Sequence, residues 1–468
     1  MNSQRLNDFS GSFIPSSIRL SGDDAELGFH DLIGFFQQFS RTFQQAGVST
    51  GDVMWIEARH ELARGVLILY LLEHRYGFVM GRPGSGNEPD VPRFCRWIAA
   101  ITEVDASAPG MRLELRHNAG FSDSAARHTG GWVFFRTSGS TGSPRLVAHD
   151  RGKLLRNAAG CADRFELNES RRVALPVPIW HMFGFGAGFL PGVIAGSTID
   201  LQADSNVLRY QQRETEFAPD VTYLTPAQVN GINRVRKQPR PYRLTIVAGD
   251  VLKREAFHRY EELGGAPVQL YGSTELGAVS ASSPGDGADE RSDTVGTPMP
   301  GVECRICPDG ETLQCRHPFG FEAYVSLDGD VERQPPASWI DTHDMAEFTA
   351  SGRIRILGRA DHRIKRDGIL VDLDAVAATV EGVPGIRSCV CIGGRDGPRG
   401  KEITAFCVQE RGANGGTDDI RRHLMRRLAR REVPDRIVIL PELPLLDNGK
   451  IDRQRLAVYA DDCHGDEP

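Results

Sequence analysis

Short apolar runs that alternate with helix-like stretches constrain the fold of this chain more than any other feature. Between Phe29 and Gly47, apolar side chains recur at helical spacing, and a second helix is expected at Lys253–Leu263. The expected buried strands are Val53–Ala58, Ile194–Leu201, Val221–Leu224, Leu244–Ala248 and Val268–Leu270. This alternation predicts an α/β fold of layered subdomains with mostly parallel sheets.

The pattern changes after about Trp339, where a second and smaller folding unit is expected. Its predicted strands are Arg353–Leu357, Arg363–Val371, Cys389–Gly393, Thr404–Gln409 and Arg436–Leu440, and its predicted helices are Leu373–Glu381 and Asp418–Arg431. We therefore predict a large N-terminal domain, residues 1–360, and a small C-terminal α+β domain, residues 361–468.

Charge and cysteine content exclude several classes of function. A formal charge of −7 and a pI near 6.0 provide no general attraction for nucleic acid or acidic membranes. Nine scattered cysteines in 468 residues do not form a disulfide scaffold, so a reducing cytoplasm is expected. The amino terminus has no signal-peptide pattern, and the apolar runs Val66–Leu72 and Gly184–Gly196 are too short for membrane insertion.

A loop rich in hydroxyl groups and glycine, Thr137–Arg145, follows the apolar strand that ends near Phe135. Backbone N–H groups and hydroxyls packed this closely can surround phosphate oxygens. The spacing is not that of a Walker A loop, and an ordinary solvent-exposed loop is the alternative.

This loop resembles the phosphate-binding loop of the acyl-adenylate-forming superfamily, which includes acyl- and aryl-CoA ligases, luciferases and peptide-synthetase adenylation domains. Thr137 to Pro144 match the family's Thr-Ser-Gly-Ser-Thr-Gly-x-Pro, and Arg145 replaces the usual lysine. The resemblance implies that the ATP phosphates are held by Thr137, Ser138, Gly139, Ser140, Thr141, Gly142 and Arg145. A guanidinium keeps the charge of the lysine but offers different donors.

A second segment, Tyr271–Glu275, matches the family's Tyr-Gly-x-Thr-Glu. The resemblance implies that Tyr271 and Gly272 contact the nucleotide, that Thr274 reaches the α-phosphate and that Glu275 holds Mg²⁺. An aromatic face, a hydroxyl and a hard oxygen ligand suit these tasks. Gly249 and Asp250 occupy the family's small-residue turn beside adenine, where Asp250 is a departure.

Three further segments complete the resemblance. Trp339–Asp344 is similar to the family's ribose-binding segment, with His343 in place of glycine, and implies that Asp344 accepts hydrogen bonds from the ribose. Gly358–Asp361 matches the family's Gly-Arg-x-Asp, and the resemblance implies that Arg359 contacts the nucleotide and that Asp361 is the hinge of a mobile C-terminal domain. Pro444–Arg453 matches the family segment whose lysine enters the active site during adenylation, which implies that Lys450 is catalytic.

The segment Pro178–Phe185 bears on the acid substrate. It lacks the aspartate that binds the amino group in peptide synthetases, but its His181-Met182-Phe183 is similar to that of CoA ligases. The resemblance implies that His181 is catalytic, either near the carboxylate or gating the thiol tunnel. The implied acid pocket consists of His181, Phe183, Ala187, Gly272, Ala278 and Val279. Bulky Phe183 among small residues favours a small aryl acid such as a hydroxybenzoate, with a short fatty acid as the alternative, and His181 could instead be a hydrogen-bonded core residue.

The resemblance also bears on the thiol acceptor. Gly368 matches the glycine that lines the family's pantetheine tunnel, although the usual glutamate nearby is Ala375. Arginines of the predicted helix Asp418–Arg431 could dock an acidic carrier protein or CoA phosphates, but a solvated face is the more common explanation.

Three other hypotheses come from the sequence. Cys304, Cys307, Cys315 and His317 could form a zinc site, but the alternation around the Pro308–Gly310 turn favours a β-hairpin. Gly184, Gly186 and Gly188 lack the spacing and acidic partner of a dinucleotide fingerprint. A non-catalytic adenylate-binding module is disfavoured because Glu275, Asp344 and Lys450 are all present.

Together these observations predict a ligase that uses ATP and Mg²⁺ to convert a carboxylic acid to an acyl-adenylate. The acyl group is then expected to pass to the phosphopantetheine thiol of an acyl carrier protein or CoA.

Overall fold

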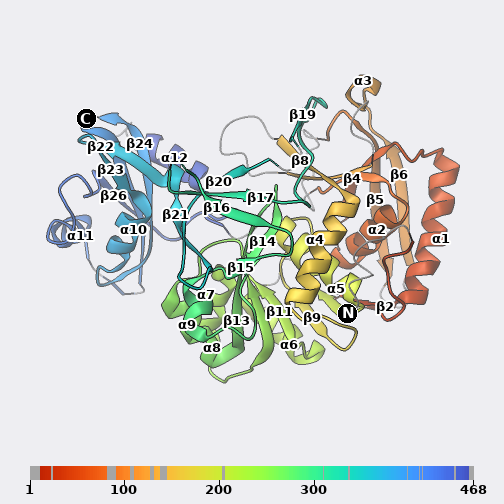
Figure 1. Cartoon of the computed structure of the whole chain (residues 1–468), viewed down its shortest axis with the longest axis horizontal. Coiled ribbons are helices and arrows are strands. Elements are labelled where there is room, and N and C mark those ends of the chain that lie inside the picture. The colour runs from red at the N-terminus through yellow and green to blue at the C-terminus, as the bar shows by residue number, and fades with distance from the viewer. Residues whose placement is uncertain are drawn as a thin grey trace. The chain divides into compact units, whose positions relative to one another are not determined.

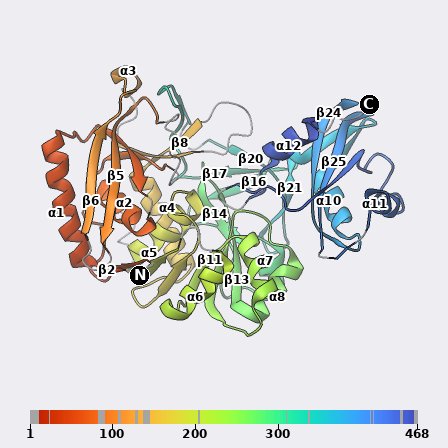
Figure 2. The same ribbon diagram turned by 180° about the vertical axis from the view of Figure 1, so that it is seen from behind.

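The computed structural model in Figures 1 and 2 divides into two compact units. The first unit comprises residues 1–304, 315–340 and 348–355, and the second comprises residues 305–314, 341–347 and 356–468. The structure describes residues 11–22, 25–58, 60–81, 91–105, 110–126, 131–136, 145–202, 206–308, 310–335, 338–397, 399–410, 412–413, 415–446 and 450–462.

The first unit contains a long sheet with the strand order β15-β14-β13-β12-β11-β9-β10-β1-β2. These strands are β1 Arg19–Ser21, β2 Glu26–Gly28, β9 Arg172–Leu175, β10 Thr198–Leu201, β11 Val221–Leu224, β12 Tyr242–Val247, β13 Gly265–Ser273, β14 Gly277–Ala281 and β15 Thr297–Pro298. Pairing is parallel from β13 through β1 and antiparallel at both ends. The buried parallel strands explain the continuous apolar runs in the sequence.

Helices pack on this sheet, and those that lie between β9 and β13 in the chain connect its parallel strands (Figure 1). The helices on the sheet are α4 Arg151–Arg164, α5 Leu190–Ala195, α6 Val207–Phe217, α7 Pro226–Val235, α8 Arg254–Gly264 and α9 Ala288–Asp293, together with the π-helix η2 Phe183–Phe189. α6 packs on β9, α7 on β11 and α8 on β13, whereas α4 packs on β14 and η2. Parallel neighbours require such crossovers, so the predicted α/β layering is confirmed.

A second sheet in the first unit has the order β19-β18-β8-β7-β4-β3-β5-β6. Its strands are β3 Val53–Ala58, β4 Gly77–Val79, β5 Cys95–Asp105, β6 Gly110–His117, β7 Trp132–Arg136, β8 Arg145–Asp150, β18 Ala323–Ser326 and β19 Val331–Arg333. The helices α1 Phe29–Ala46 and α2 Glu61–Glu73 pack on β6 and β3, and α3 Asp123–Ala126 is a single turn. The predicted strand Val53–Ala58 and the helix that ends before Gly47 are both confirmed.

The second unit is built on the sheet order β23-β22-β25-β24, with β26 beside β25. Its elements are β22 Arg363–Arg366, β23 Ile369–Asp372, α10 Leu373–Glu381, β24 Ile386–Gly397, β25 Gly400–Gln409, α11 Thr417–Leu424, β26 Arg436–Leu440 and α12 Arg453–Asp462. Alternation places Cys389, Cys391 and Cys407 in one apolar cluster with α10 and α11, and Val390, Ile392 and Phe406 in another with Leu456 and Ala460 of α12.

Two sequence-based predictions for this unit are wrong in extent. The helix predicted at Asp418–Arg431 ends at Leu424, because the Arg421 guanidinium donates to the carbonyls of Pro434 and Asp435 and the chain turns back. The strand predicted at Arg363–Val371 is a hairpin of β22 and β23. Its turn holds Asp367 at φ 50° and Gly368 at φ 79°, so this left-handed conformation is an independent reason for glycine at 368.

A fourth sheet has the order β16-β17-β20-β21, formed by β16 Glu303–Ile306, β17 Thr312–Arg316, β20 Ile340–Phe348 and β21 Ile354–Arg359. The predicted hairpin at Cys304–Cys315 is confirmed, with the N–H of Cys307 donating to Thr312 O over 2.8 Å. The Sγ atoms of Cys304 and Cys315 lie 3.6 Å apart, whereas the His317 Nε2–H donates to Ala278 O and His317 Nδ1 accepts from the Phe319 N–H.

Every cysteine within the described ranges is a free thiol. Among those same residues, no helix has the length and apolar character that crossing a bilayer would require.

Arg366 is the most deeply buried charge in the second unit's sheet, with an exposed fraction of 1%. Its two terminal nitrogens donate to the two oxygens of Asp435, each over 2.8 Å, and Asp435 also accepts from the Ile403 N–H. We predict that Arg366→Met lowers the free energy of unfolding by about 3 kcal/mol, because it leaves a half-buried carboxylate without its counter-charge.

Urea unfolding followed by tryptophan fluorescence and circular dichroism measures this loss. Arg422→Met is the matched control, since Arg422 forms a surface ion pair with Asp419 and should cost less than about 1 kcal/mol. Equal losses in the two variants would contradict the prediction.

Candidate active site

The predicted nucleotide segment Tyr271–Glu275 leaves the end of β13 and turns into β14. The register shifts between Tyr271 and Gly272, and a Cβ atom at Gly272 would lie 2.1 Å from Gly277 O. Gly277 has φ 67°, which favours glycine. Glycine is therefore required at position 272, because β13 and β14 approach closely there. The neighbouring Tyr271 is half-buried beside the turn.

The turn after Tyr271 is fixed by hydrogen bonds from other strands. His149 on β8 donates its Nε2–H to Thr274 O over 2.7 Å, because a carbonyl can only accept. The Glu275 carbonyl accepts from the Phe321 N–H over 2.9 Å, and Glu275 Oε1 accepts from the Tyr324 hydroxyl over 3.3 Å. Thr274 and Glu275 are thus held by two separate parts of the chain, β8 and the segment from Phe321 to Tyr324.

Two buried histidines support this region. Desolvation lowers the pKa of His149 to about 4, and desolvation likewise lowers the pKa of His317 to about 4. The backbone of Ala278 is bonded by Asn157 on both its N–H and its carbonyl, and His317 Nε2 lies 3.0 Å from the same carbonyl. Ala278 and Val279, two predicted pocket residues, are consequently buried and fixed.

The predicted acid-binding segment enters the π-helix η2. A Cβ at Gly184 would lie 2.1 Å from Pro178 O, so the segment passes close over the start of the helix. The ring centroids of His181 and the adjacent Trp180 lie 3.8 Å apart with the planes tilted by 41°. Phe183 is half-buried, and its ring centroid lies 6.0 Å from that of Tyr223. Ala187 is buried within η2. Gly184 thus allows the close approach of two backbone segments.

A buried ion pair holds the start of this segment. Glu61 Oε2 accepts from the Ile179 N–H over 3.2 Å, and Glu61 Oε1 lies 3.4 Å from Nε of Arg64. Arg64 is completely buried and also donates to the carbonyls of Gly81 and Ala58. The backbone that leads to His181 is therefore tied to α2.

Gly249 and Asp250 form the turn after β12. Gly249 has φ 102°, which is a glycine conformation. The Asp250 carboxylate is exposed and accepts from the Val251 N–H over 2.8 Å. Asp250, which stands where the family has a small residue, thus helps to close this turn.

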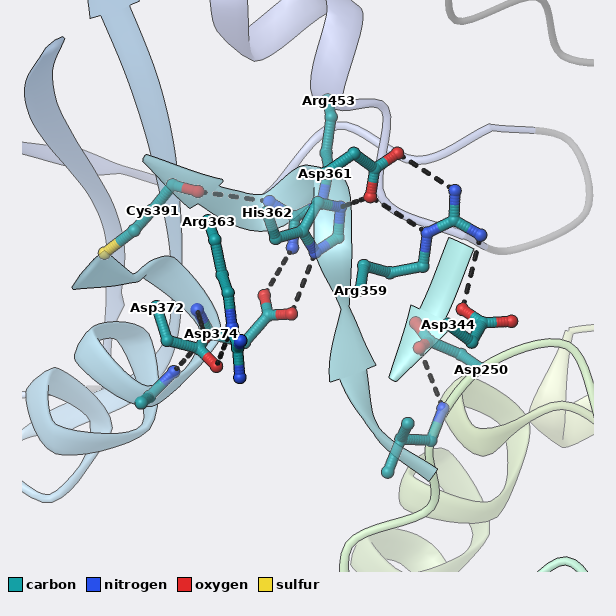
Figure 3. Close-up of polar contacts among 12 residues, drawn as sticks. Asp250, Asp344, Arg359, Asp361, His362, Arg363, Asp372, Asp374, Cys391 and Arg453 are labelled. Atoms are coloured by element: carbon teal, nitrogen blue, oxygen red, sulfur yellow. Dashed lines mark hydrogen bonds and ion pairs between the residues drawn. The ribbon is translucent and has the colours of Figure 1, made fainter. Parts of the chain in front are cut away.

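In the second unit, Asp344, Arg359 and Asp361 form one cluster (Figure 3). Arg359 donates to Asp344 Oδ1 over 3.3 Å and to both oxygens of Asp361 over 3.0 and 2.9 Å. The hydrogen bond to Asp361 raises the pKa of Arg359, and that same bond lowers the pKa of Asp361. This cluster joins β20 to the 3₁₀ turn η3 Ala360–His362.

His343 stands at φ 58°, the left-handed region, at the position where the family usually has glycine. The Asp341 carboxylate accepts from the His343 N–H over 2.7 Å and stabilises this turn. The backbone shape that glycine allows is therefore kept with a histidine.

Lys450 is exposed and ends a small hairpin. The Leu446 N–H donates to Lys450 O over 2.7 Å, and Leu445 bridges Ile451. Gly368 lies at the tip of the β22–β23 hairpin, where a Cβ would meet no atom within 4 Å. The predicted phosphate-loop residues Thr137–Gly142 lie outside the described residues, and Arg145, the first described residue after them, pairs with Glu332 at 3.4 Å.

Several supporting residues were not singled out by the sequence analysis: Glu61, Arg64, His149, Asn157, Tyr324, His362, Asp374 and Arg453. The only local signal for His149 is a polar residue that ends the apolar strand Leu146–Ala148. Its partner is 125 positions away, which local patterns do not reveal.

Comparison with protein-family models identifies the class of protein. A model described as AMP-binding enzyme matches residues 130–320, and the AMP-binding enzyme C-terminal domain matches residues 375–450. Together they cover more than half of the chain. The chain therefore belongs to the acyl-adenylate-forming, AMP-binding superfamily.

Curated relatives are similar at modest identity. A probable CoA ligase from Humulus lupulus is 27% identical over 70% of this chain and 66% of its own length. A salicylyl-CoA synthase/salicylate adenylyltransferase from a Streptomyces species is 27% identical over 69% of this chain and 62% of its own length. The aligned part of the chain thus spans somewhat less than two thirds of these relatives.

Solved structures share the fold across nearly the whole chain. ATP-bound MatB from Rhodopseudomonas palustris superposes with a TM-score of 0.78 and 17% identity, covering 98% of both chains. The anthranilate CoA ligase AuaEII in complex with anthranoyl-AMP gives a TM-score of 0.74 at 17% identity, covering 98% of this chain and 99% of the other. The predicted fold class is confirmed.

The two buried histidines predict acid sensitivity of the first unit. Because each folded-state pKa of about 4 lies below the ordinary value of 6.5, stability is complete above pH 6.5 and is lost as the pH falls toward 4. At pH 5 each histidine should cost about 2 kcal/mol.

Urea unfolding from pH 7 to pH 5 in the wild type and in His149→Gln tests this. The amide of glutamine can donate to Thr274 O without titrating, so the variant should lose less stability over this range. Parallel curves for the two proteins would contradict the role given to His149.

Proposed function

We propose that the protein is an ATP-dependent acid–thiol ligase that forms an acyl-adenylate and then a thioester. The observation that carries this proposal is that the two family matches cover both Tyr271–Glu275 and Lys450, so one chain carries both sets of family landmarks. CoA ligases among the curated relatives support the same reaction class.

In the first half-reaction, a carboxylate oxygen of the acid attacks the α-phosphorus of ATP, and pyrophosphate leaves. Lys450 supplies an ammonium group that stabilises the negative charge developing on the α-phosphate. Thr274 contributes a hydroxyl toward the same phosphate, and the phosphate-loop residues Thr137–Gly142 with Arg145 hold the leaving group. Asp344 and Arg359 bind the ribose side of the nucleotide, and Tyr271, Gly249 and Asp250 lie beside adenine.

The chemistry of Glu275 fits the proposed magnesium ion. Its Oε1 accepts from Tyr324, whereas Oε2 has no hydrogen-bond partner among the residues that the structure describes. A carboxylate oxygen is a ligand that Mg²⁺ prefers, and the ion would neutralise phosphate charge. Glu275 would hold it from a backbone fixed by Phe321.

For the acid, we propose a small aryl carboxylate such as a hydroxybenzoate, with a short fatty acid as the second candidate. His181 and Phe183 border a segment fixed by Glu61, and the bulky Phe183 ring among the small residues Ala187 and Ala278 favours a flat or short acid over a long chain. Relatives named for salicylate, anthranilate and indoleacetate support an aromatic acid.

In the second half-reaction, the thiol sulfur attacks the acyl carbon, the bond to AMP breaks, and the thiol proton is released. We propose CoA as the acceptor, with a carrier-protein phosphopantetheine as the alternative, Gly368 beside the thiol arm and Asp361 as the hinge. Free thiols throughout the described residues are compatible with a cytoplasmic location.

Pyrophosphate exchange with benzoates, cinnamates and short fatty acids tests the proposal and names the acid. Acid-dependent exchange is expected to be strongest with a substituted benzoate. ATP binding without exchange for any acid would favour a non-catalytic adenylate-binding module.

We predict that Lys450→Ala lowers pyrophosphate exchange by on the order of 10²–10³-fold, because one charged donor to the transition state is lost. Thioester formation from a supplied acyl-adenylate should stay near the wild-type rate. Lys401→Ala, another exposed lysine of the second unit, is the control and should change neither reaction. Equal loss of both half-reactions in Lys450→Ala would contradict this role.

A further inference from the structure

The Asp374 carboxylate, in the first turn of α10, is bound from two sides (Figure 3). His362 Nδ1 lies 2.8 Å from Oδ2, and Arg453 donates to Oδ1 over 2.9 Å. Since an ionised carboxylate only accepts, His362 must carry its proton on Nδ1. Asp374 therefore joins the turn after Asp361 to the first residue of α12.

The backbone of Asp374 is itself fixed. Asp372 caps α10 by accepting from the N–H groups of Asp374 and Ala375 over 2.9 and 3.1 Å. Burial raises the pKa of Asp374, but the hydrogen bond from His362 and the charge of Arg453 outweigh it, so its pKa lies below the ordinary value. Asp374 is thus an anion between two donors.

Arg453 lies three residues after Lys450 and is anchored a second time, by donation to Cys391 O of β24 over 3.1 Å. The short chain between them is also constrained. Asp452 donates its N–H to Pro444 O over 2.9 Å, and Ile451 packs against the cluster that contains Leu456. Because the chain between them is held in this way, a displacement of Arg453 should also displace Lys450.

On the other side, His362 continues a chain of polar contacts. His362 Nε2 lies 3.9 Å from Asp361 Oδ1, and Asp361 binds Arg359, which also donates to Asp344. All of these residues belong to the second unit. Hydrogen bonds therefore link the proposed ribose contact to Asp361 and link His362 to the beginning of α12, and the neighbouring residues Asp361 and His362 are joined through the backbone.

We propose that Asp374 is a positioning residue for adenylation, which couples the Asp361–His362 turn to Arg453 so that Lys450 moves with this turn as one piece. The proposal rests on the proposed function, because it gives Lys450 its role there. Asp374 acts through Arg453 and does not touch the reacting atoms. Loss of the Asp374 carboxylate should therefore impair adenylation, which needs Lys450, and should leave thioester formation unaffected.

The test uses the full-length chain with Asp374→Ala, Arg453→Ala and the double variant. Pyrophosphate exchange should fall on the order of tenfold to a hundredfold in each, since small displacements of a catalytic group have effects of this size. Thioester formation from a supplied acyl-adenylate should stay within about twofold, because that step does not use Lys450. The double variant should be no worse than either single variant.

Asp419→Ala is the matched control. Asp419 is also a first-turn aspartate paired with an arginine in the second unit, but on α11, and its loss should leave both half-reactions unchanged. Equal loss of both half-reactions in Asp374→Ala, or no loss of exchange, would overturn the proposal.

Hydrogen exchange separates this proposal from the proposed function. In Asp374→Ala, amides of residues 450–456 should exchange faster than in the wild type, whereas those of β26 should not. Unchanged protection of residues 450–456 would overturn the coupling even in an active enzyme. If the wild type shows no pyrophosphate exchange with any acid, the proposed function fails, while faster amide exchange would still support the mechanical link.

Discussion

The guanidinium group of Arg359, held between Asp344 and Asp361, is the contact on which the proposed chemistry of the second unit depends. It also donates to Thr342 O over 3.2 Å, so one planar group fixes a strand backbone and two carboxylates. Arginine offers several donors in a rigid fork, which suits this task better than lysine would. The cluster keeps Asp344 oriented and the turn at Asp361 defined.

The strands and helices that the sequence predicted well are those with strong local patterns. Val53–Ala58, Val221–Leu224, Leu373–Glu381 and Arg436–Leu440 agree with the structure residue for residue. The helix predicted to run to Arg431 ends seven residues earlier, since contacts of Arg421 with a distant part of the chain override helical propensity. Element boundaries set by such tertiary contacts are not encoded locally.

The candidate site shows the same division. Gly272, Thr274 and Glu275 could be proposed as site residues from the sequence because their residue types follow from the resemblance. His149 and Tyr324 could not, because they hold the turn from strands far away in sequence. His343 shows how a departure is accommodated. The left-handed backbone that glycine would supply is kept, with Asp341 stabilising it.

The proposed function requires that AMP becomes attached to the carboxyl group of the acid. One carboxyl oxygen of the acid should then remain in AMP when the thioester forms. An acid labelled with heavy oxygen in its carboxyl group, ATP, Mg²⁺ and CoA would be incubated with the protein, and the nucleotide products analysed by mass spectrometry. Attack of the carboxylate on the α-phosphorus predicts AMP that carries one heavy oxygen, together with unlabelled pyrophosphate. Label in inorganic phosphate with release of ADP, or unlabelled AMP, would contradict adenylate formation.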